Sequence, residues 1–164
     1  MIEVSPAATA EDWQAASGLV AEYLLSFQSG PAPCLHARDH ARLAALRSTF
    51  DGSGSALLVA RVTGAPVGCC GLQSLEDDTA ELKRLYVRPH MRRRGVGRKL
   101  LAAAVDHAAR LGYQRLLLDV VPDRAAAIGF YQRSGSHRVA HWEGRLDMLA
   151  FELPLASGSF GQLR

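Results

Sequence analysis

Residues 81–98 read ELKRLYVRPHMRRRGVGR and form the most informative unit of the sequence. Alternation from Glu81 to Arg88 is typical of a strand, and the glycines at 95 and 97 then open a long amphipathic segment. The apolar face of that segment consists of Val96, Leu100, Leu101, Ala104, Val105, Ala108 and Leu111. The stretch therefore predicts a strand that passes through a glycine turn into a helix over 95–111, which Gly112 ends.

The glycine turn is suited to binding an anion. A strand-to-helix turn directs several backbone N–H groups at one point, and the helix dipole adds partial positive charge. Gly95 and Gly97 lack the Cβ atoms that would keep an anion away, and the arginines at 92–94 add charge. The turn contains neither Gly-Lys-Ser/Thr nor GxGxxG, so we expect neither a nucleotide P-loop nor a dinucleotide fold. The turn predicts a site for a diphosphate.

The rest of the chain predicts a single α/β domain over residues 1–155, with a loose tail at 156–164. Strands are expected over 2–4, 56–62, 67–72, 81–88, 115–121, 136–140 and 145–153. Helices are expected from a cap at Thr9, over about 36–49, over 95–111, and from a cap at Asp123 to Gln132. The predicted order is β-α-α-β-β-β-α-β-α-β-β.

Composition narrows the class of protein. The 164 residues are 48% hydrophobic with a net charge of +3, and no run of about 18 apolar residues predicts a membrane span. The N-terminus lacks the layout of a signal peptide. Cys34, Cys69 and Cys70 form neither a disulfide framework nor a zinc spacing, and alternation places the adjacent pair on opposite faces of a strand. We therefore expect reduced thiols, no metal and a cytoplasmic location.

A dense basic cluster leaves a second interpretation of the turn open. Its members are Arg84, Arg88, His90, Arg92, Arg93, Arg94, Arg98 and Lys99. Such a cluster indicates either an anion site or a nucleic-acid surface. A reader of single-stranded RNA would need interleaved exposed aromatic residues, and the turn has none. The sequence therefore favours the anion site, and we expect no nucleic-acid partner.

The pattern Arg-x-x-Gly-x-Gly at residues 92–97 resembles the acetyl-CoA motif of the GNAT N-acetyltransferases. The preceding LYVRP at 85–89 and the later AAAIGFY at 125–131 are also similar to that family. The likeness is strong over about 81–135 and weak in the first 55 residues. It implies a GNAT-like mixed central sheet, in which the fourth and fifth strands splay apart in a V that admits the cofactor.

The resemblance also implies how acetyl-CoA is held. Main-chain groups of Leu85, Tyr86 and Val87 would pair with the pantetheine arm as if it were an extra strand. The pyrophosphate would lie on backbone N–H groups from Arg93 to Arg98. The other implied cofactor residues are Arg92, Arg94, Gly95, Val96, Gly97, Arg124 and Tyr131. Arg124 stands where many members carry an asparagine, and Gly135-Ser136 replaces the usual Gly-Phe, which predicts altered packing near the sixth strand.

Transfer of an acetyl group to an amine needs a base for the amine and an acid for the leaving thiolate. The resemblance assigns the acid to Tyr131; the alternative is a packed core aromatic. Glu81 is the first candidate for the base, and alternation predicts that it shares a strand face with Lys83, Leu85 and Val87. The alternative for Glu81 is an ordinary exposed carboxylate.

Asp119 is a rival for the base, because a charge directly after Leu116-Leu117-Leu118 is unusual in a buried strand. It could instead be the structural partner of an arginine. His137 and His141 could line the acceptor site, although we expect them at the surface.

The resulting prediction is an acetyl-CoA-dependent N-acetyltransferase that acts on the primary amine of a small or amino-acid-like acceptor. The alternative is a non-catalytic acyl-CoA-binding regulator of the same fold. The acceptor is expected between the N-terminal helices and the last two strands, and the surplus of cations weakly favours a carboxylate on it. Dimers are common in the resembled family, so a homodimer is one of the assemblies that the resemblance allows.

Overall fold

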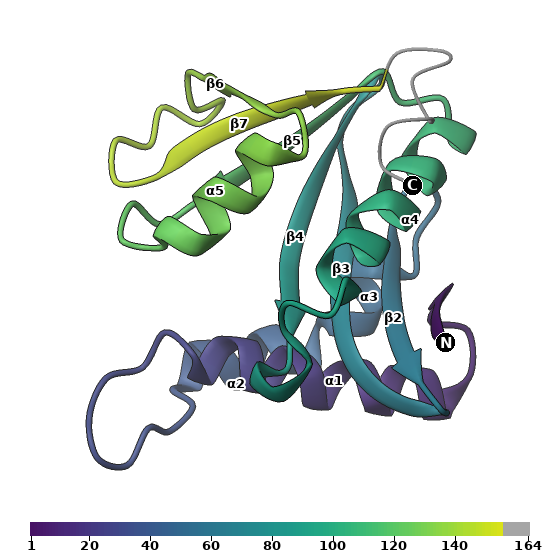
Figure 1. The fold of residues 1–164 in the computed structure, drawn as a ribbon, viewed down its shortest axis with the longest axis vertical. Coiled ribbons are helices and arrows are strands. Elements are labelled where there is room, and N and C mark those ends of the chain that lie inside the picture. The colour runs from purple at the N-terminus through teal and green to yellow at the C-terminus, as the bar shows by residue number, and fades with distance from the viewer. Residues whose placement is uncertain (156–164) are drawn as a thin grey trace.

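The computed structural model describes residues 1–155; the tail predicted at 156–164 lies outside the described residues. The strands are β1 (Ile2–Pro6), β2 (Ala56–Val62), β3 (Ala65–Glu76), β4 (Thr79–Val87), β5 (Arg115–Val120), β6 (His137–Val139) and β7 (Leu149–Pro154). The helices are α1 (Ala10–Leu25), α2 (Ala37–Ala44), α3 (Leu46–Phe50), α4 (Val96–Arg110) and α5 (Ala125–Arg133), with a 3-10 turn η1 (Pro89–Met91). The strands form one mixed sheet in the order β1-β2-β3-β4-β5-β7-β6 (Figure 1). The predicted order of elements is confirmed, except that the second helix is split and η1 is added.

The fourth and fifth strands are joined over only a short stretch. β4 and β5 run parallel, and their register pairs Thr79–Glu81 with Arg115–Leu117. Beyond these pairs the strands separate, while β5 continues beside the antiparallel β7 as far as Val120. Figure 1 shows the opening as a V between β4 and β5. The predicted GNAT-like sheet with a splayed V is therefore confirmed.

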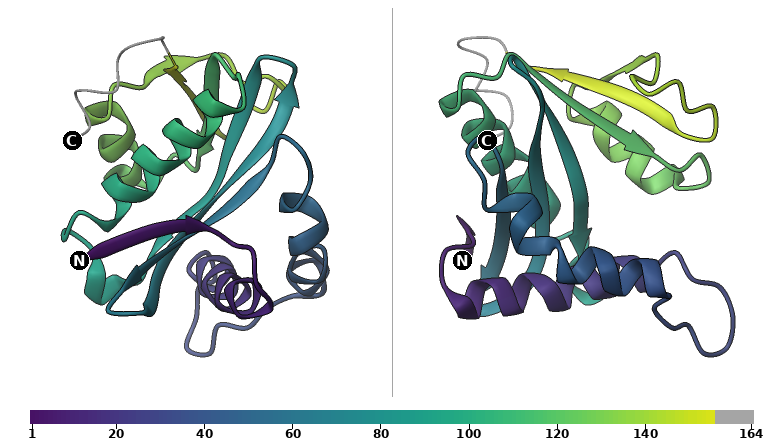
Figure 2. Two further views of the ribbon diagram at one scale, coloured as in Figure 1. Left: turned by 90° about the vertical axis from the view of Figure 1, so that its right-hand side faces the viewer. Right: turned by 180° about the vertical axis from the view of Figure 1, so that it is seen from behind.

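Helices cover both faces of the sheet (Figure 2). The apolar face of α4 packs on one side, and α5 lies on the same side beneath β5 and β7. The helices α1, α2 and α3 lie on the other side, where α1 and α3 bury their apolar residues. Cys69 and Cys70 have no exposed surface and belong to the two opposite core clusters, as alternation predicts.

The first helix begins as its sequence predicts. The Asp12 N–H donates to Thr9 Oγ1 at 3.2 Å, and the Thr9 N–H donates to the Asp12 carboxylate at 3.0 Å. The hydrogen bonds that the Asp12 carboxylate accepts, first that from the Thr9 N–H and then that from the Ala8 N–H, lower the pKa of Asp12 to about 2. The capping box thus fixes the start of α1.

The prediction of one helix over 36–49 is wrong, because the helix breaks at Ala45. The Ser48 and Thr49 hydroxyls donate to the Ala45 carbonyl at 2.9 and 2.8 Å, so this carbonyl is satisfied at the break. The chain restarts as α3 in a direction that buries Leu46 and Phe50 under the sheet.

A β-bulge in β4 overturns the predicted alternation of this strand. Between Cys69 and Gly71 of β3 the register shifts by one residue, and Arg84 adopts a left-handed φ of +55°. Before the bulge, Glu81 and Lys83 lie on one face. After it, Leu85 and Val87 pack with the α4 core on the opposite face. The prediction that these four residues share a face is therefore wrong.

The last helix and the last strand begin at other residues than the sequence predicts. The cap residue of α5 is Arg124, without a side-chain cap, and not Asp123. β7 starts at Leu149 and not at 145, because the chain bends over residues 146–148. In the part of the chain that the structure describes, no helix is long and apolar enough to cross a membrane.

Candidate acetyl-CoA and acceptor site

The turn before α4 presents unused backbone donors. Arg93 and Gly95 adopt left-handed φ angles of +62° and +85°, after which α4 starts at Val96. Among residues 1–155, backbone hydrogen bonding stops at the Arg92 N–H and resumes only at the Lys99 N–H, which bonds the Gly95 carbonyl. The N–H groups between them lie at the positive end of the helix dipole. This arrangement can bind a phosphate group.

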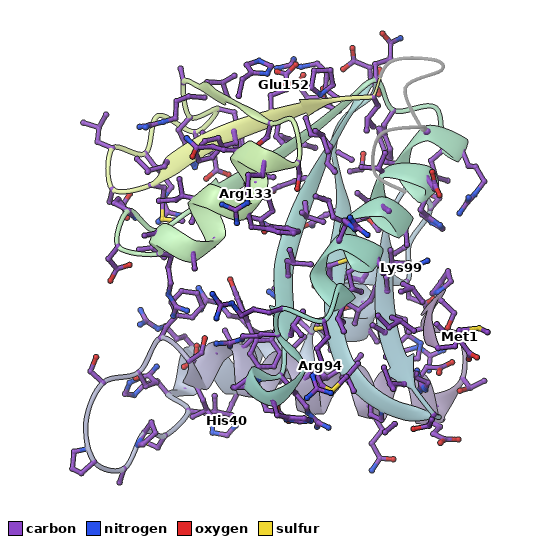
Figure 3. All side chains as sticks on the ribbon, viewed as in Figure 1. Met1, His40, Arg94, Lys99, Arg133 and Glu152 are labelled. Atoms are coloured by element: carbon purple, nitrogen blue, oxygen red, sulfur yellow. The ribbon has the colours of Figure 1, made fainter. Side chains whose placement is uncertain are left out.

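The arginines of the turn have two different roles. Arg92 Nε donates to the Val87 carbonyl at 2.9 Å, and its guanidinium lies 5.9 Å from the centre of the Tyr86 ring. These contacts brace the turn against β4. Arg93 and Arg94 are exposed, and Figure 3 shows Arg94 at the foot of β4, where α4 begins. Their charges are therefore available to an anion bound at the turn.

The two glycines of the motif are required for different reasons. Gly95 is surrounded by open space, but its left-handed φ would strain any residue with a side chain. A Cβ added at Gly97 would only touch Phe130 at 3.7 Å and Val87 at 3.9 Å, which are ordinary contact distances. The fold itself therefore requires glycine at 95 and not at 97.

The edge of β4 that faces the V is free beyond Glu81. Leu85, Tyr86 and Val87 lie after the last β4–β5 pair, and no strand within residues 1–155 pairs with them on this side. A free strand edge can pair with an extended segment of another molecule. The residues predicted to hold the pantetheine arm thus lie where such an arm could bind.

Glu81 lies where the V begins, opposite Leu117 in the last pair of β4 and β5. Only 7% of the residue is exposed, and one carboxylate oxygen lies 3.2 Å from Lys83 Nζ. Burial raises the pKa of Glu81, Lys83 opposes that shift, and Asp119 and Glu143 add to it. A carboxylate with a raised pKa is suited to act as a base near neutral pH. The alternative of an ordinary exposed carboxylate does not fit this burial.

Asp119 is held by two cationic or polar partners. His141 Nε2 lies 3.1 Å from its carboxylate, and Arg145 Nη1 lies 3.8 Å from the same oxygen. His141 Nδ1 accepts the Glu143 N–H at 3.1 Å, so Nε2 is the nitrogen that donates to Asp119. The His141 side chain is only 3% exposed, which overturns the expectation that it lies at the surface. The partners of Asp119 fit the structural role that the sequence left open.

Tyr131 lies on α5, with its ring buried in the core shared with α4. Burial raises the pKa of its hydroxyl far above the usual range, with further contributions from Tyr23, Cys70 and Asp119. The phenol is therefore protonated at any physiological pH. The charge of Asp119 adds to the raised pKa of both Tyr131 and Glu81, after burial as the main cause.

Arg124 joins the two sides of the V. Its Nη2 donates to the Ser26 carbonyl at the end of α1 at 2.7 Å, and its guanidinium lies 4.2 Å from the centre of the Phe27 ring. This places Arg124 between α5 and the end of α1. Whether it also contacts the cofactor, as the resemblance implies, stays a prediction.

Two residues on the α1 side were missed by the sequence analysis. Glu22 accepts hydrogen bonds from the Tyr86 hydroxyl at 3.2 Å and from Arg88 Nη2 at 2.7 Å, which ties α1 to the end of β4. Arg84 lies on the bulge, with its guanidinium 5.4 Å from the centre of the Phe50 ring. The partners lie far apart in the sequence, and no motif marks them.

Comparisons with known proteins show the family of this chain and its fold. The family model described as the acetyltransferase (GNAT) family matches residues 19–135. A search of curated protein sequences finds no match. A GNAT-family acetyltransferase from Staphylococcus aureus Mu50 shares the fold with a TM-score of 0.78 at 15% identity, covering 95% of this chain and 100% of its own.

Two further solved structures were determined with the cofactor. A putative acetyltransferase from Salmonella typhimurium, solved with acetyl-CoA, has a TM-score of 0.72 at 23% identity and covers 96% of this chain and 95% of its own. The PaiA N-acetyltransferase from Thermoplasma acidophilum, solved with coenzyme A, has a TM-score of 0.72 at 17% identity. The match covers 94% of this chain and 99% of that protein's chain. These likenesses show the fold, and the family model covers well over half of the chain. This chain, with its free glycine turn and its open V, belongs to the GNAT acetyltransferase family.

Proposed function

We propose that this protein uses acetyl-CoA to acetylate the primary amine of a small or amino-acid-like acceptor. The observation that carries the proposal is the pair formed by Glu81 and Tyr131 on the two sides of the V. Both residues are buried. Burial raises the pKa of the Glu81 carboxylate, which suits it to accept a proton, and it keeps the Tyr131 hydroxyl protonated, so that its hydrogen is available to the leaving sulfur.

The binding part of the proposal rests on the turn and on the strand edge. The free N–H groups from Arg93 to Arg98 would hold the pyrophosphate of acetyl-CoA, and the free edge at Leu85–Val87 would pair with the pantetheine arm. A pantetheine arm on that edge runs along the V, so the thioester at its end comes close to Glu81 and Tyr131.

The chemistry then needs three proton movements. Alkyl amines have a pKa of about 10.4, so the acceptor must lose a proton, which Glu81 accepts directly or through water. The neutral amine nitrogen attacks the carbonyl carbon to give a tetrahedral adduct, and the C–S bond breaks as the adduct collapses. The Tyr131 hydroxyl donates its hydrogen to the sulfur as negative charge develops there, so that CoA leaves as a thiol. The nitrogen loses its second proton, which returns to the phenolate through water. The products are an acetamide and free CoA.

The test is a panel of primary amines, including amino acids and polyamines, incubated with acetyl-CoA and followed by detection of the released thiol. Calorimetry with CoA measures cofactor binding separately. We expect CoA binding and acetylation of at least one class of amine. CoA binding without thiol release across the whole panel would contradict the proposal and favour a non-catalytic CoA-binding regulator. Absence of CoA binding would contradict both.

A further inference from the structure

The bulge in β4 directs Arg84 toward the acceptor side of the V. With its left-handed φ of +55°, Arg84 places its guanidinium over the Phe50 ring of α3, on the face that α1 covers. It lies three residues after Glu81, just beyond the last β4–β5 pair. The glycine turn and α4 lie on the other face. Arg84 is therefore close to the V but on the side opposite the proposed cofactor turn.

Arg84 lacks the partners that other partly buried arginines of this protein have. Arg61 pairs with Asp12 at 3.0 Å, and Arg88 pairs with Glu22 at 2.7 Å. Arg84 is also partly buried, yet its side chain makes neither an ion pair nor a hydrogen bond within residues 1–155, and its Nη1 is enclosed without a partner. A buried charge without a counter-ion lowers stability. A ligand that supplies the counter-ion of Arg84 would offset this loss of stability.

The surroundings of Arg84 favour an anion. Burial lowers the pKa of its guanidinium, but an arginine stays charged at neutral pH. The nearby charged side chain from α2 is Arg42, a second cation, which repels the first. Burial raises the pKa of the neighbouring Tyr23, so its hydroxyl is a neutral donor. A cation, a neutral donor and an apolar ring together suit a carboxylate, which a guanidinium binds through charge-assisted hydrogen bonds.

We propose that the acceptor carries a carboxylate beside its amine and that Arg84 binds this carboxylate while the amine lies at Glu81. This inference rests on the proposed function. Arg84 touches the substrate but no reacting atom, so it determines specificity. A polyamine or a neutral amine would leave the guanidinium unpaired and would meet two cations, so such amines should be poor acceptors.

The experiment uses matched amines, each offered as the carboxylate and as its neutral amide: α-amino acids, β-alanine and 4-aminobutyrate. Thiol release is measured for the wild type, for Arg84→Gln and Arg84→Lys, and for Arg110→Gln, which removes an equal charge at the far end of α4. Calorimetry with CoA confirms that each variant is folded and binds the cofactor. We expect the wild type to prefer the carboxylate of at least one pair. Arg84→Gln should raise the KM for that acceptor about 10- to 100-fold with little change in the KM for acetyl-CoA. Arg84→Lys should recover part of the loss, and Arg110→Gln should behave as the wild type.

Each outcome decides between the two proposals. Equal turnover of the amides, or a preference for carboxylates that Arg84→Gln leaves unchanged, would overturn the role of Arg84 and leave the N-acetyltransferase intact. CoA binding without turnover of any amine would contradict the proposed function and, with it, the acceptor.

Discussion

Next to the V, the two faces of the sheet are built in different ways. On the α4 face, the turn from Arg92 to Gly97 forms a site from consecutive residues, and most of its donors are backbone N–H groups. On the α1 face, the groups come from elements far apart in the chain: Tyr23 from α1, Phe50 from α3 and Arg84 from the bulge. A site made of backbone groups can be read from a short motif. A site made of side chains depends on the whole fold, and can differ between proteins that share the turn.

The largest expected effect concerns the proposed acid, Tyr131, which belongs to the core on the α4 face. Tyr131→Phe removes one hydroxyl from a buried ring and should slow acetyl transfer at least about tenfold, and up to about 10⁴-fold, because the leaving sulfur loses its proton donor. CoA binding should be kept. The turnover number and calorimetry with CoA measure the two effects. An unchanged rate would assign Tyr131 to core packing alone.

Glu81→Gln tests the base. We expect the rate at neutral pH to fall about 10- to 100-fold, since the amine then loses its proton acceptor. The pKa of Glu81 is raised above 4.5, and the ionised form is the active base, so the wild-type rate should rise with pH through this raised pKa. In the variant this acidic limb should be absent. A pH profile of kcat/KM shared by both proteins would rule Glu81 out.

The raised pKa of Glu81 also makes stability depend on pH: the rate should rise with pH, whereas the contribution of Glu81 to stability should fall. The folded protein binds the proton of Glu81 more tightly than the unfolded chain does. The contribution of this group to stability is therefore present at low pH and is lost as pH rises from 4.5 through the raised pKa.

Two glycine variants sharpen the description of the turn. Gly95→Ala should lower the free energy of unfolding by about 1–2 kcal/mol, because alanine is strained at a φ of +85°. Gly97→Ala should leave stability nearly unchanged, because its Cβ meets only ordinary contacts, yet it should weaken binding of acetyl-CoA if the pyrophosphate lies against this residue. Thermal unfolding and calorimetry separate the two effects. Equal losses of stability would show that both glycines serve the fold.

The smallest effect on the rate is expected for Asp119→Asn. We expect a change of the rate of no more than about threefold, but a loss of about 1–3 kcal/mol in the free energy of unfolding, because the carboxylate accepts from His141 in a half-buried site. Denaturant unfolding and steady-state rates measure both. A rate loss as large as that of Glu81→Gln would instead make Asp119 the base.

The sequence predicted the parts of the molecule that depend on local patterns. The capping box at Thr9, the apolar face of α4 and the opposite orientation of Cys69 and Cys70 follow from spacing alone. The face of Leu85 and Val87 could not be predicted, since a single left-handed residue at Arg84 reverses the alternation. The break at Ala45 depends on the burial of α3 beneath the sheet.

The environments of the candidate site residues could not be predicted from the sequence either. The sequence left the role of Asp119 open between a base and a structural partner of an arginine, because His141 and Arg145 lie in the loop between β6 and β7. It left Glu81 open between a base and an ordinary exposed carboxylate, because nothing nearby in the sequence shows that this residue is buried. In both cases the environment of the carboxylate is set by tertiary contacts, which bury Glu81 and supply the partners of Asp119.

The short seam between β4 and β5 has a consequence for how the protein folds and opens. Three residue pairs join the backbones of the two halves of the sheet at this point, whereas β5 and β7 pair along their whole length. The Gln114 and Arg115 N–H groups also donate to the Asp78 carbonyl beside these pairs. Side chains join the halves further: the core around α4 also contains Leu116 and Leu118 of β5 and Phe151 of β7. Cooperativity between the halves therefore depends on apolar packing more than on the sheet, and it weakens on cooling as the hydrophobic effect does. The V, where acetyl-CoA is proposed to bind, is therefore also the boundary along which the two halves of the sheet can separate.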